Sequence, residues 1–166
     1  MSEKVCDHTS VGMIVFNEDR EILLIERKKP PFGWAAPAGH VDGDPSFEEA
    51  TVRELREEVG LRALSCTLML DEKINNPCRR VDGSWHHWKV YKMNTTGEIE
   101  QSEDEVKTYH WTDAGILRHL LEKTQRYENK EMTEQEWEAD PGLEPVWKHI
   151  FDKIGISLMI EGEEEK

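Results

Sequence analysis

Strand-forming residues gather in several short stretches of the chain. Residues 9–16 and 21–27 are rich in β-branched and large apolar side chains, and the turn-forming residues 17–20 between them predict a β-hairpin. The next residues, 28–33, are predicted to form a loop, because they include two prolines and proline has no N–H to donate to a neighbouring strand. Further extended stretches are predicted at residues 34–40, 63–73, 85–95 and 106–111.

A 3.6-residue period predicts an amphipathic helix after Ser46, which is a suitable N-cap residue. The helix is expected to run to about Val59 and to stop at Gly60. Its core-facing stripe is predicted to consist of Val52, Leu55 and Val59.

Two further helices are predicted near the C-terminal end. One covers residues 112 to about 130, with apolar residues on one side. The other covers residues 143–154, and Asp140-Pro141 is expected to provide its N-cap and first-turn proline. Strands and helices mixed in this way indicate an α/β layered domain. We expect a single domain over residues 1–160 and an acidic, disordered tail at 161–166.

Three glutamates lie on one face of the first predicted helix. Glu57 and Glu58 follow Glu54 by three and four residues, so the three carboxylates project to the same side. Crowded carboxylates repel one another unless a cation lies among them, and such hard oxygen ligands suit Mg²⁺ or Mn²⁺. The alternative is an ordinary solvated face, with Arg53 and Glu57 as an i,i+4 ion pair.

The stretch around these glutamates resembles the Nudix box. The positions in register are Gly39, Arg53, Glu54, Leu55, Glu57, Glu58, Gly60 and Leu61. One position departs from the pattern, since Pro45 stands where the box has its first glutamate. The resemblance implies a Nudix-type α/β/α sandwich with a mixed sheet, here with an additional C-terminal helix.

The same resemblance implies a reaction, namely Mg²⁺- or Mn²⁺-assisted attack of water on phosphorus within a pyrophosphate linkage. The implied metal ligands are the Gly39 carbonyl and the carboxylates of Glu54, Glu57 and Glu58, while Arg53 orients the glutamates. The general base stays open between Glu54, Glu57 and an acid of the later loop 101–106. Within that loop Glu105 is preferred and Glu103 comes second, and Glu105 is also a candidate metal ligand.

Substrate contacts are expected from basic and aromatic residues near the predicted site. Arg27 is the preferred phosphate ligand, because a guanidinium binds phosphate oxygens in a bidentate manner. Phe32 and Trp34 are candidates for stacking on a nucleobase, while core packing is the favoured alternative for each. Further candidates are Lys28, Lys29, Arg79, Arg80 and Trp85. His86 and His87 cannot easily share an ion, because neighbouring strand residues point to opposite faces.

The 166-residue chain is strongly acidic, with a net charge of −14. Such a field disfavours nucleic-acid polymers and anionic membranes, but bound cations still permit small phosphorylated substrates. Three widely spaced cysteines form neither a disulfide framework nor a zinc pattern. No apolar run reaches membrane-spanning length and no signal peptide is evident, so a cytoplasmic enzyme is expected. A homodimer is a possible assembly, since the resembling family includes monomers and dimers.

Three interpretations of function follow from these features. The first is hydrolysis of a nucleoside di- or triphosphate derivative, with the triphosphate-cleaving group favoured by the acidic loop. An ADP-ribose-cleaving enzyme is a variant of it, because Pro77 lies near a position at which such enzymes carry proline. The second is a catalytically silent nucleotide sensor, and the third is a structural domain whose acids are solvated surface.

Overall fold

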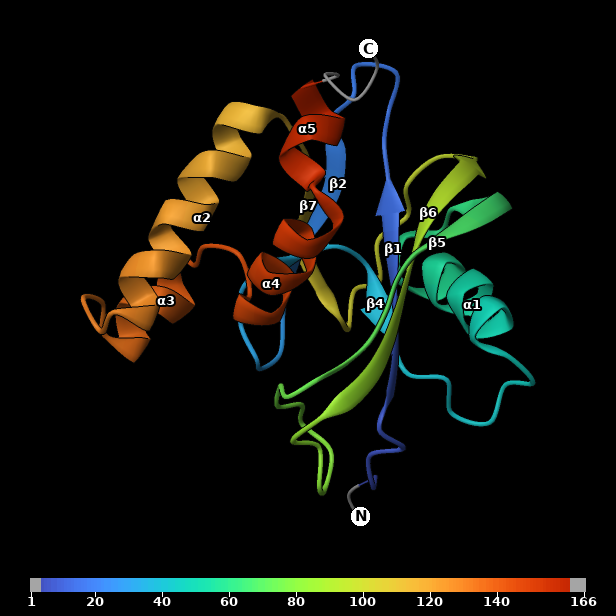
Figure 1. Ribbon diagram of the computed structural model, residues 1–166, viewed down its shortest axis with the longest axis horizontal. Helices are drawn as coiled ribbons and strands as arrows, with labels where there is room; N and C mark the ends of the chain where they lie inside the picture. Colours follow the sequence, from blue (N-terminus) through green and yellow to red (C-terminus); the bar gives the residue numbers. More distant parts are fainter. Residues whose placement is uncertain (1–3, 162–166) are drawn as a thin grey trace.

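The computed structural model describes residues 4–161, and within them seven strands form two sheets with helices on both sides (Figure 1). The larger sheet has the order β4-β1-β6-β5. Its strands are β1 (Thr9–Val15), β4 (Ala38–Gly39), β5 (Arg62–Ile74) and β6 (His86–Thr96). β1 runs parallel to β6, whereas β4–β1 and β5–β6 are antiparallel, so the sheet is mixed, as predicted.

The smaller sheet has the order β3-β2-β7 and is antiparallel. It consists of β2 (Ile22–Arg27), β3 (Trp34–Ala35) and β7 (Val106–Thr112). The predicted hairpin of the first two strands is therefore wrong, because β1 and β2 lie in different sheets and an isolated bridge from Phe16 to Ile22 joins them. The turn itself forms, with the N–H of Asn17 bonded to the Glu21 carbonyl at 3.0 Å. The turn residues reverse the chain direction, but they do not determine which strands pair. β1 pairs with β6 and β2 pairs with β7, both far along the chain.

Strand residues alternate between two cores. Val11, Met13 and Val15 of β1 face the core beneath α1 (Phe47–Val59), whereas Ile14 faces the core beneath the C-terminal helices. α1 accordingly lies on one side of the β1–β6–β5 strands and the later helices lie on the other (Figure 1). This layering matches the predicted α/β/α sandwich.

The bounds of α1 are set by its caps, as predicted. The Ser46 hydroxyl accepts a hydrogen bond from the N–H of Glu49, and Gly60 ends the helix in the left-handed region at φ 76°. The predicted core stripe is wrong at Val52, which is 45% exposed. Thr51 is buried in its place beside Leu55, so the buried face is rotated by one residue toward the sheet.

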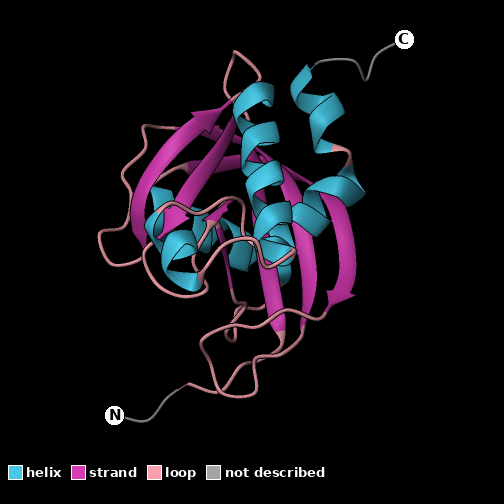
Figure 2. Cartoon of the chain, turned by 90° about the vertical axis from the view of Figure 1, so that its left-hand side faces the viewer, coloured by secondary structure: helices cyan, strands magenta, loops and turns pink. Residues whose placement is uncertain are grey.

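Four helices follow β7, namely α2 (Ala114–Glu128), α3 (Glu134–Ala139), α4 (Pro145–Ile154) and α5 (Ile156–Glu161). The predicted start of the final helix is wrong, because Asp140 ends α3 and Pro145 is the first-turn proline of α4. The short helices α3 and α5 were not expected. Seen from their side, the C-terminal helices stand in front of the strands (Figure 2). The predicted tail at 161–166 lies outside the described residues, apart from Glu161 at the end of α5.

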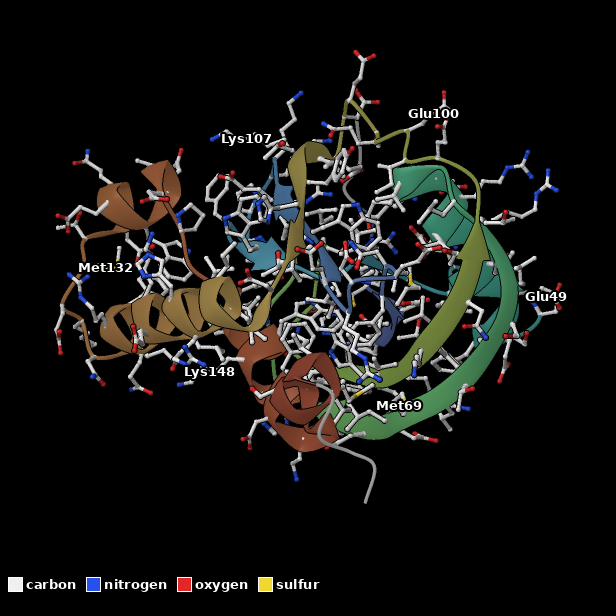
Figure 3. The ribbon with its side chains drawn as sticks, turned by 90° about the horizontal axis from the view of Figure 1, so that it is seen from above. Glu49, Met69, Glu100, Lys107, Met132 and Lys148 are labelled. Atoms are coloured by element: carbon white, nitrogen blue, oxygen red, sulfur yellow. The ribbon has the colours of Figure 1, made fainter. Side chains whose placement is uncertain are left out.

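The view from above shows how far apart the two helical layers are. Glu49 on α1 and Met132 beside α3 mark opposite sides of the molecule, and the long strands β5 and β6 curve together around the α1 side (Figure 3). Within residues 4–161 no helix is both long and apolar enough to cross a membrane.

Candidate active site

A cleft of about 430 Å³ opens where β4, α1, the loop after β5, the loop before β7 and the start of α4 meet. Its volume lies within the range of small-molecule sites. Most of the residues predicted for the site line it. They are Arg27, Gly39, Arg53, Glu54, Glu57, Glu58, Arg79, Arg80 and Glu105.

The centre of the cleft is a close approach between α1 and β4. The carboxylate of Glu54 lies directly against the α-carbon of Gly39, and a β-carbon at that position would overlap it. Glycine is therefore required at position 39 for steric reasons. Burial raises the pKa of Glu54 to about 7, although the charge of Arg53 opposes the shift.

Glu58 lies beside Glu54 and is more deeply buried, with 8% of its surface exposed. One of its carboxylate oxygens accepts a hydrogen bond of 2.9 Å from the N–H of Ala38. Burial raises the pKa of Glu58 to about 8, and the neighbouring charge of Glu54 adds to the shift. The raised pKa values of the half-buried Glu54 and the buried Glu58 show that nearby positive charge does not fully offset their burial, so a cation would stabilise the site.

Arg53 organises the open side of the cleft. Its Nη1 donates to Glu54 at 2.9 Å and to Glu57 at 3.1 Å, its Nε donates to Asp44 at 2.9 Å, and its Nη2 donates to the His40 carbonyl at 3.0 Å. Burial acts against the charged guanidinium, but the bond to Asp44 and the charge of Glu54 outweigh it and raise the pKa of Arg53. Arg53 thus fixes the glutamates relative to the loop before α1.

Glu57 and Glu105 are two acids of the cleft that water can reach. The Glu57 side chain is 59% exposed, and that of Glu105 is 45% exposed and lies 3.7 Å from the guanidinium of Arg79. The loop that carries Glu105 is tied to the end of α1, because the N–H of Ser102 donates to the Glu58 carbonyl at 2.8 Å. Glu103, the second choice for the base, does not line the cleft.

Arg27 enters the cleft from the end of β2. Its Nε is buried without a hydrogen-bond partner among the described atoms, and its Nη2 makes a long contact of 3.5 Å with the Pro30 carbonyl. That Nε has no accessible surface, so an anion in the cleft would meet the terminal guanidinium nitrogens of Arg27. Of the other predicted cations, Lys28 and Lys29 lie outside the cleft lining.

The oxygen donors of the cleft show which kind of metal ion would suit it. Glu54, Glu57, Glu58 and the Gly39 backbone together offer hard oxygen donors, the type that Mg²⁺ and Mn²⁺ prefer. The acids outnumber the nearby cation of Arg53, and Glu54 and Glu58 have raised pKa values. The residues therefore fit a divalent cation.

The comparison with known proteins assigns the family. Residues 7–135 match the family model for the NUDIX domain, which is most of the chain. The chain belongs to the NUDIX domain family.

Individual Nudix relatives cover smaller parts. The 8-oxo-dGDP phosphatase NUDT18 of Danio rerio is 32% identical over 108 residues, which are 62% of this chain and 31% of that protein. The m7GpppN-mRNA hydrolase NUDT17 of Xenopus laevis is 32% identical over 127 residues, or 67% and 43% of the two chains. The chain thus spans less than half the length of either relative. The crystal structure of the MutT protein from Methanosarcina mazei Go1 shares the fold, with a TM-score of 0.65 over 99% of this chain and 100% of that chain at 19% identity.

Pro45 stands where the Nudix box has its first glutamate, and the neighbouring Asp44 supplies an acid in the same loop. The neighbouring Asp44 carries a carboxylate that holds the Nε of Arg53, so an acid of this loop is still tied to the box arginine. Asp44 also donates its N–H to the Val41 carbonyl at 3.1 Å, which closes the turn before α1.

The aromatic residues predicted to stack on a base lie elsewhere in this Nudix domain. Trp34 packs against the core beneath the C-terminal helices, and the Phe32 carbonyl accepts a hydrogen bond from Trp137 at 3.0 Å. Trp85 stacks on His8. The aromatic residues that line the cleft are Trp88 and Trp147.

Glu144 is a cleft residue that the sequence did not reveal. It precedes α4, is 7% exposed, and lines the cleft together with Arg27. Burial raises its pKa to about 7, and the charge of Arg27 partly offsets this. The signal in the sequence was slight, a glutamate before a first-turn proline, and the wrong helix start at Asp140 hid it.

His86 and His87 point to opposite faces, as predicted. His87 bonds to Asp71 at the surface, whereas His86 is 1% exposed and faces the cleft. There it meets Cys6, His40 and Cys78, which the sequence analysis did not group together. Burial lowers the pKa of His40 to about 4 and lowers that of His86, while burial raises the pKa of the Cys6 thiol.

Proposed function

We propose that this Nudix protein is a hydrolase that cleaves the pyrophosphate linkage of a nucleoside di- or triphosphate derivative with Mg²⁺ or Mn²⁺. The observation that carries the proposal is the pair of carboxylates held against the β4 backbone, that of Glu58 buried and that of Glu54 half-buried. Withdrawing two adjacent acids from water is costly unless a cation joins them, and a solvated face would leave both exposed. This also disfavours the interpretation as a structural domain.

The cation would be held by Glu54, Glu57, Glu58 and the Gly39 carbonyl. When bound, it would neutralise phosphate charge and lower the pKa of a water molecule. Arg53 keeps Glu54 and Glu57 in place through hydrogen bonds from a single guanidinium nitrogen. The hydrogen bonds of Arg53 thus fix the positions of the two carboxylates before a cation binds.

The proton of the attacking water needs an accepting carboxylate within reach of solvent. Glu57 and Glu105 meet this condition, because both line the cleft and both are exposed. Glu58 does not meet it, since its carboxylate is buried and bonded to Ala38. We therefore assign the general base to Glu57 or Glu105, which separate Gln variants distinguish.

Phosphate groups of the substrate would meet positive charge on the opposite walls. Arg27 contributes its guanidinium group from the end of β2, and Arg79 and Arg80 come from the loop after β5. A nucleobase would lie toward Trp88, Trp147 and Glu144, which join an aromatic surface to a carboxyl group within the cleft. A half-ionised carboxyl can either donate or accept a hydrogen bond to a base edge.

The substrate class rests on the relatives. Their names refer to an oxidised nucleoside diphosphate and a capped mRNA, which share a nucleotide joined by a pyrophosphate linkage. The net charge of −14 supports a small nucleotide over a nucleic-acid polymer. An ADP-ribose-type substrate is the second candidate, because Pro77 lines the cleft. A cytoplasmic location is part of the proposal, and a homodimer is the assembly to be tested by its mass in solution.

A nucleotide panel tests the proposal. Purified protein with Mg²⁺ is incubated with nucleoside di- and triphosphates, their oxidised forms, dinucleoside polyphosphates and ADP-ribose, and products are resolved by ³¹P NMR. Turnover is expected for at least one compound, with loss in Glu57→Gln and retention in Glu49→Gln, an exposed glutamate on the same helix. Nucleotide binding by wild type without turnover of any compound would instead identify a silent sensor.

A further inference from the structure

Four side chains from distant parts of the chain converge beside the cleft. Cys6 precedes β1, His40 follows Gly39, Cys78 lies in the loop after β5, and His86 begins β6. Their ligand atoms all lie within 4.8 Å of one another, and Cys6 and His86 are buried. We call these four residues the Cys2His2 cluster.

The spacing of the cluster is that of a tetrahedral zinc site. With Zn–S near 2.3 Å and Zn–N near 2.0–2.1 Å, a sulfur and a nitrogen bound to the same zinc ion lie about 3.6 Å apart. The Cys6 sulfur lies 3.3 Å from Nε2 of His86 and 3.8 Å from Nε2 of His40. The two observed separations lie on either side of the expected one, and thiolate with imidazole is a donor set that selects zinc over Mg²⁺.

The hydrogen bonds behind His86 prepare its Nε2 for a metal. Trp88 Nε1 can only donate, and it donates to Oδ1 of Asn76 at 3.1 Å, so that atom is an acceptor. Nδ1 of His86 lies 3.0 Å from the same oxygen and must therefore carry the proton. The lone pair of the neutral imidazole is then on Nε2, which faces Cys6. Second-shell bonds of this kind orient metal-binding histidines.

The backbone prepares both sulfurs in the same way. The N–H of His8 donates to the Cys6 sulfur at 3.2 Å, and the N–H of Arg80 donates to the Cys78 sulfur at 3.4 Å. In each case the donor is two residues further along the chain, and such bonds stabilise a thiolate. A β-carbon at Gly83 would overlap the Cys78 sulfur, so glycine gives that sulfur its place.

The segments that carry the two cysteines are joined without any metal. The N–H of Cys6 donates to the Val81 carbonyl at 2.8 Å, and the N–H of Val81 donates to the Lys4 carbonyl at 2.9 Å. The N–H of Cys78 donates to the Gly83 carbonyl at 2.7 Å. Backbone hydrogen bonds therefore hold the segments that carry Cys6 and Cys78 next to each other.

We propose that Cys6, His40, Cys78 and His86 bind one zinc ion in a structural site separate from the carboxylate site. Four protein ligands complete a tetrahedral shell and leave no position for substrate, which is the mark of a structural site. Binding releases the two thiol protons to solvent, and two thiolates balance the charge of Zn²⁺. The ion would join the chain before β1, the loop before α1, the loop after β5 and β6.

Metal content tests the site directly and does not depend on hydrolysis. Wild-type protein purified under reducing conditions is dialysed and its zinc is measured by mass spectrometry. About one zinc per chain is expected. Cys78→Ser and His86→Ala are expected to lose it. Matched controls are Cys66→Ser, which is outside the cluster, and His87→Ala, whose side chain points to Asp71; both should keep it.

A second measurement uses the wild-type chain, because a ligand variant can fail to fold. A strong chelator is expected to lower the Tm and to expose two additional thiols to a thiol reagent, and Zn²⁺ but not Mg²⁺ should reverse both changes. Wild-type protein that takes up no zinc after reduction and reconstitution would overturn the proposal. So would a Cys6–Cys78 disulfide found by mass spectrometry in place of zinc, or Cys78→Ser and Cys66→Ser with equal zinc.

Discussion

The carboxylate of Glu54 occupies the space in which a β-carbon of residue 39 would lie, so α1 touches β4 at Gly39. Gly39→Ala is therefore expected to displace Glu54 and to lower kcat by about a hundredfold, the scale of an ångström-sized misplacement in a site. The measurement is steady-state hydrolysis of the substrate found in the nucleotide panel.

Gly115→Ala is the control for this change. A β-carbon there would meet only a side-chain oxygen of Asp113, at 3.5 Å, and alanine favours the first turn of α2. It should leave kcat unchanged. A Gly39→Ala variant with wild-type kcat would show that the contact between Glu54 and β4 is unrelated to activity.

Arg27 is expected to act in substrate binding, because its guanidinium group lines the cleft and carries the charge that a phosphate group requires. Arg27→Met keeps much of the aliphatic volume and removes the charged donor, a loss of about 1.5–3 kcal/mol in binding. KM should rise by about tenfold or more, while the Tm changes little. The exposed Arg62→Met on β5 is the control. Equal KM values for the two variants would remove Arg27 from the site.

The raised pKa values of Glu54 and Glu58 predict how stability depends on pH without divalent cations. The folded pKa values of Glu54 and Glu58 are about 7 and about 8, above the ordinary value of 4.5, so the folded chain binds protons more tightly than the unfolded chain. The contribution of these acids to the free energy of unfolding is therefore greatest at low pH and falls as pH rises from about 4.5 to 8.

Thermal unfolding between pH 6.5 and pH 8 measures this effect. His40 and His86, whose pKa values are lowered, contribute little change above their ordinary value of 6.5. In EDTA the Tm should fall across this window, and Glu58→Gln should be roughly 3 °C more stable than wild type at pH 8. Mg²⁺ should raise the Tm of wild type more at pH 8 than at pH 6.5. Coincident curves for wild type and Glu58→Gln would contradict the assignment.

Local patterns in the sequence predicted most of the elements and the centre of the site. Ser46 and Gly60 fixed the helix ends, and the spacing of Glu54, Glu57 and Glu58 placed three acids on one face, because capping and helical periodicity are local. The hairpin prediction failed because β1 and β2 find their partners in β6 and β7, far along the chain.

The same limit explains the cleft residues that were missed. Glu144 reaches the cleft only through the packing of α4 against the sheet, and Cys6, His40, Cys78 and His86 meet only after four segments are folded together. Trp34 and Phe32 were plausible aromatic contacts by position, but their side of the chain packs toward the C-terminal helices. Such contacts depend on tertiary structure, and spacing along the chain does not encode them.

The most direct test of the divalent-cation site is a Mn²⁺ titration followed by electron paramagnetic resonance, which reports the free ion. Wild type is expected to bind Mn²⁺, and Glu54→Gln and Glu58→Gln are each expected to bind it at least about tenfold more weakly. The control Glu49→Gln, which changes an exposed position of α1, should bind Mn²⁺ as wild type does (Figure 3). Equal Mn²⁺ affinity in wild type and in a Glu54→Gln/Glu58→Gln double variant would contradict the claim that these two carboxylates hold the divalent cation.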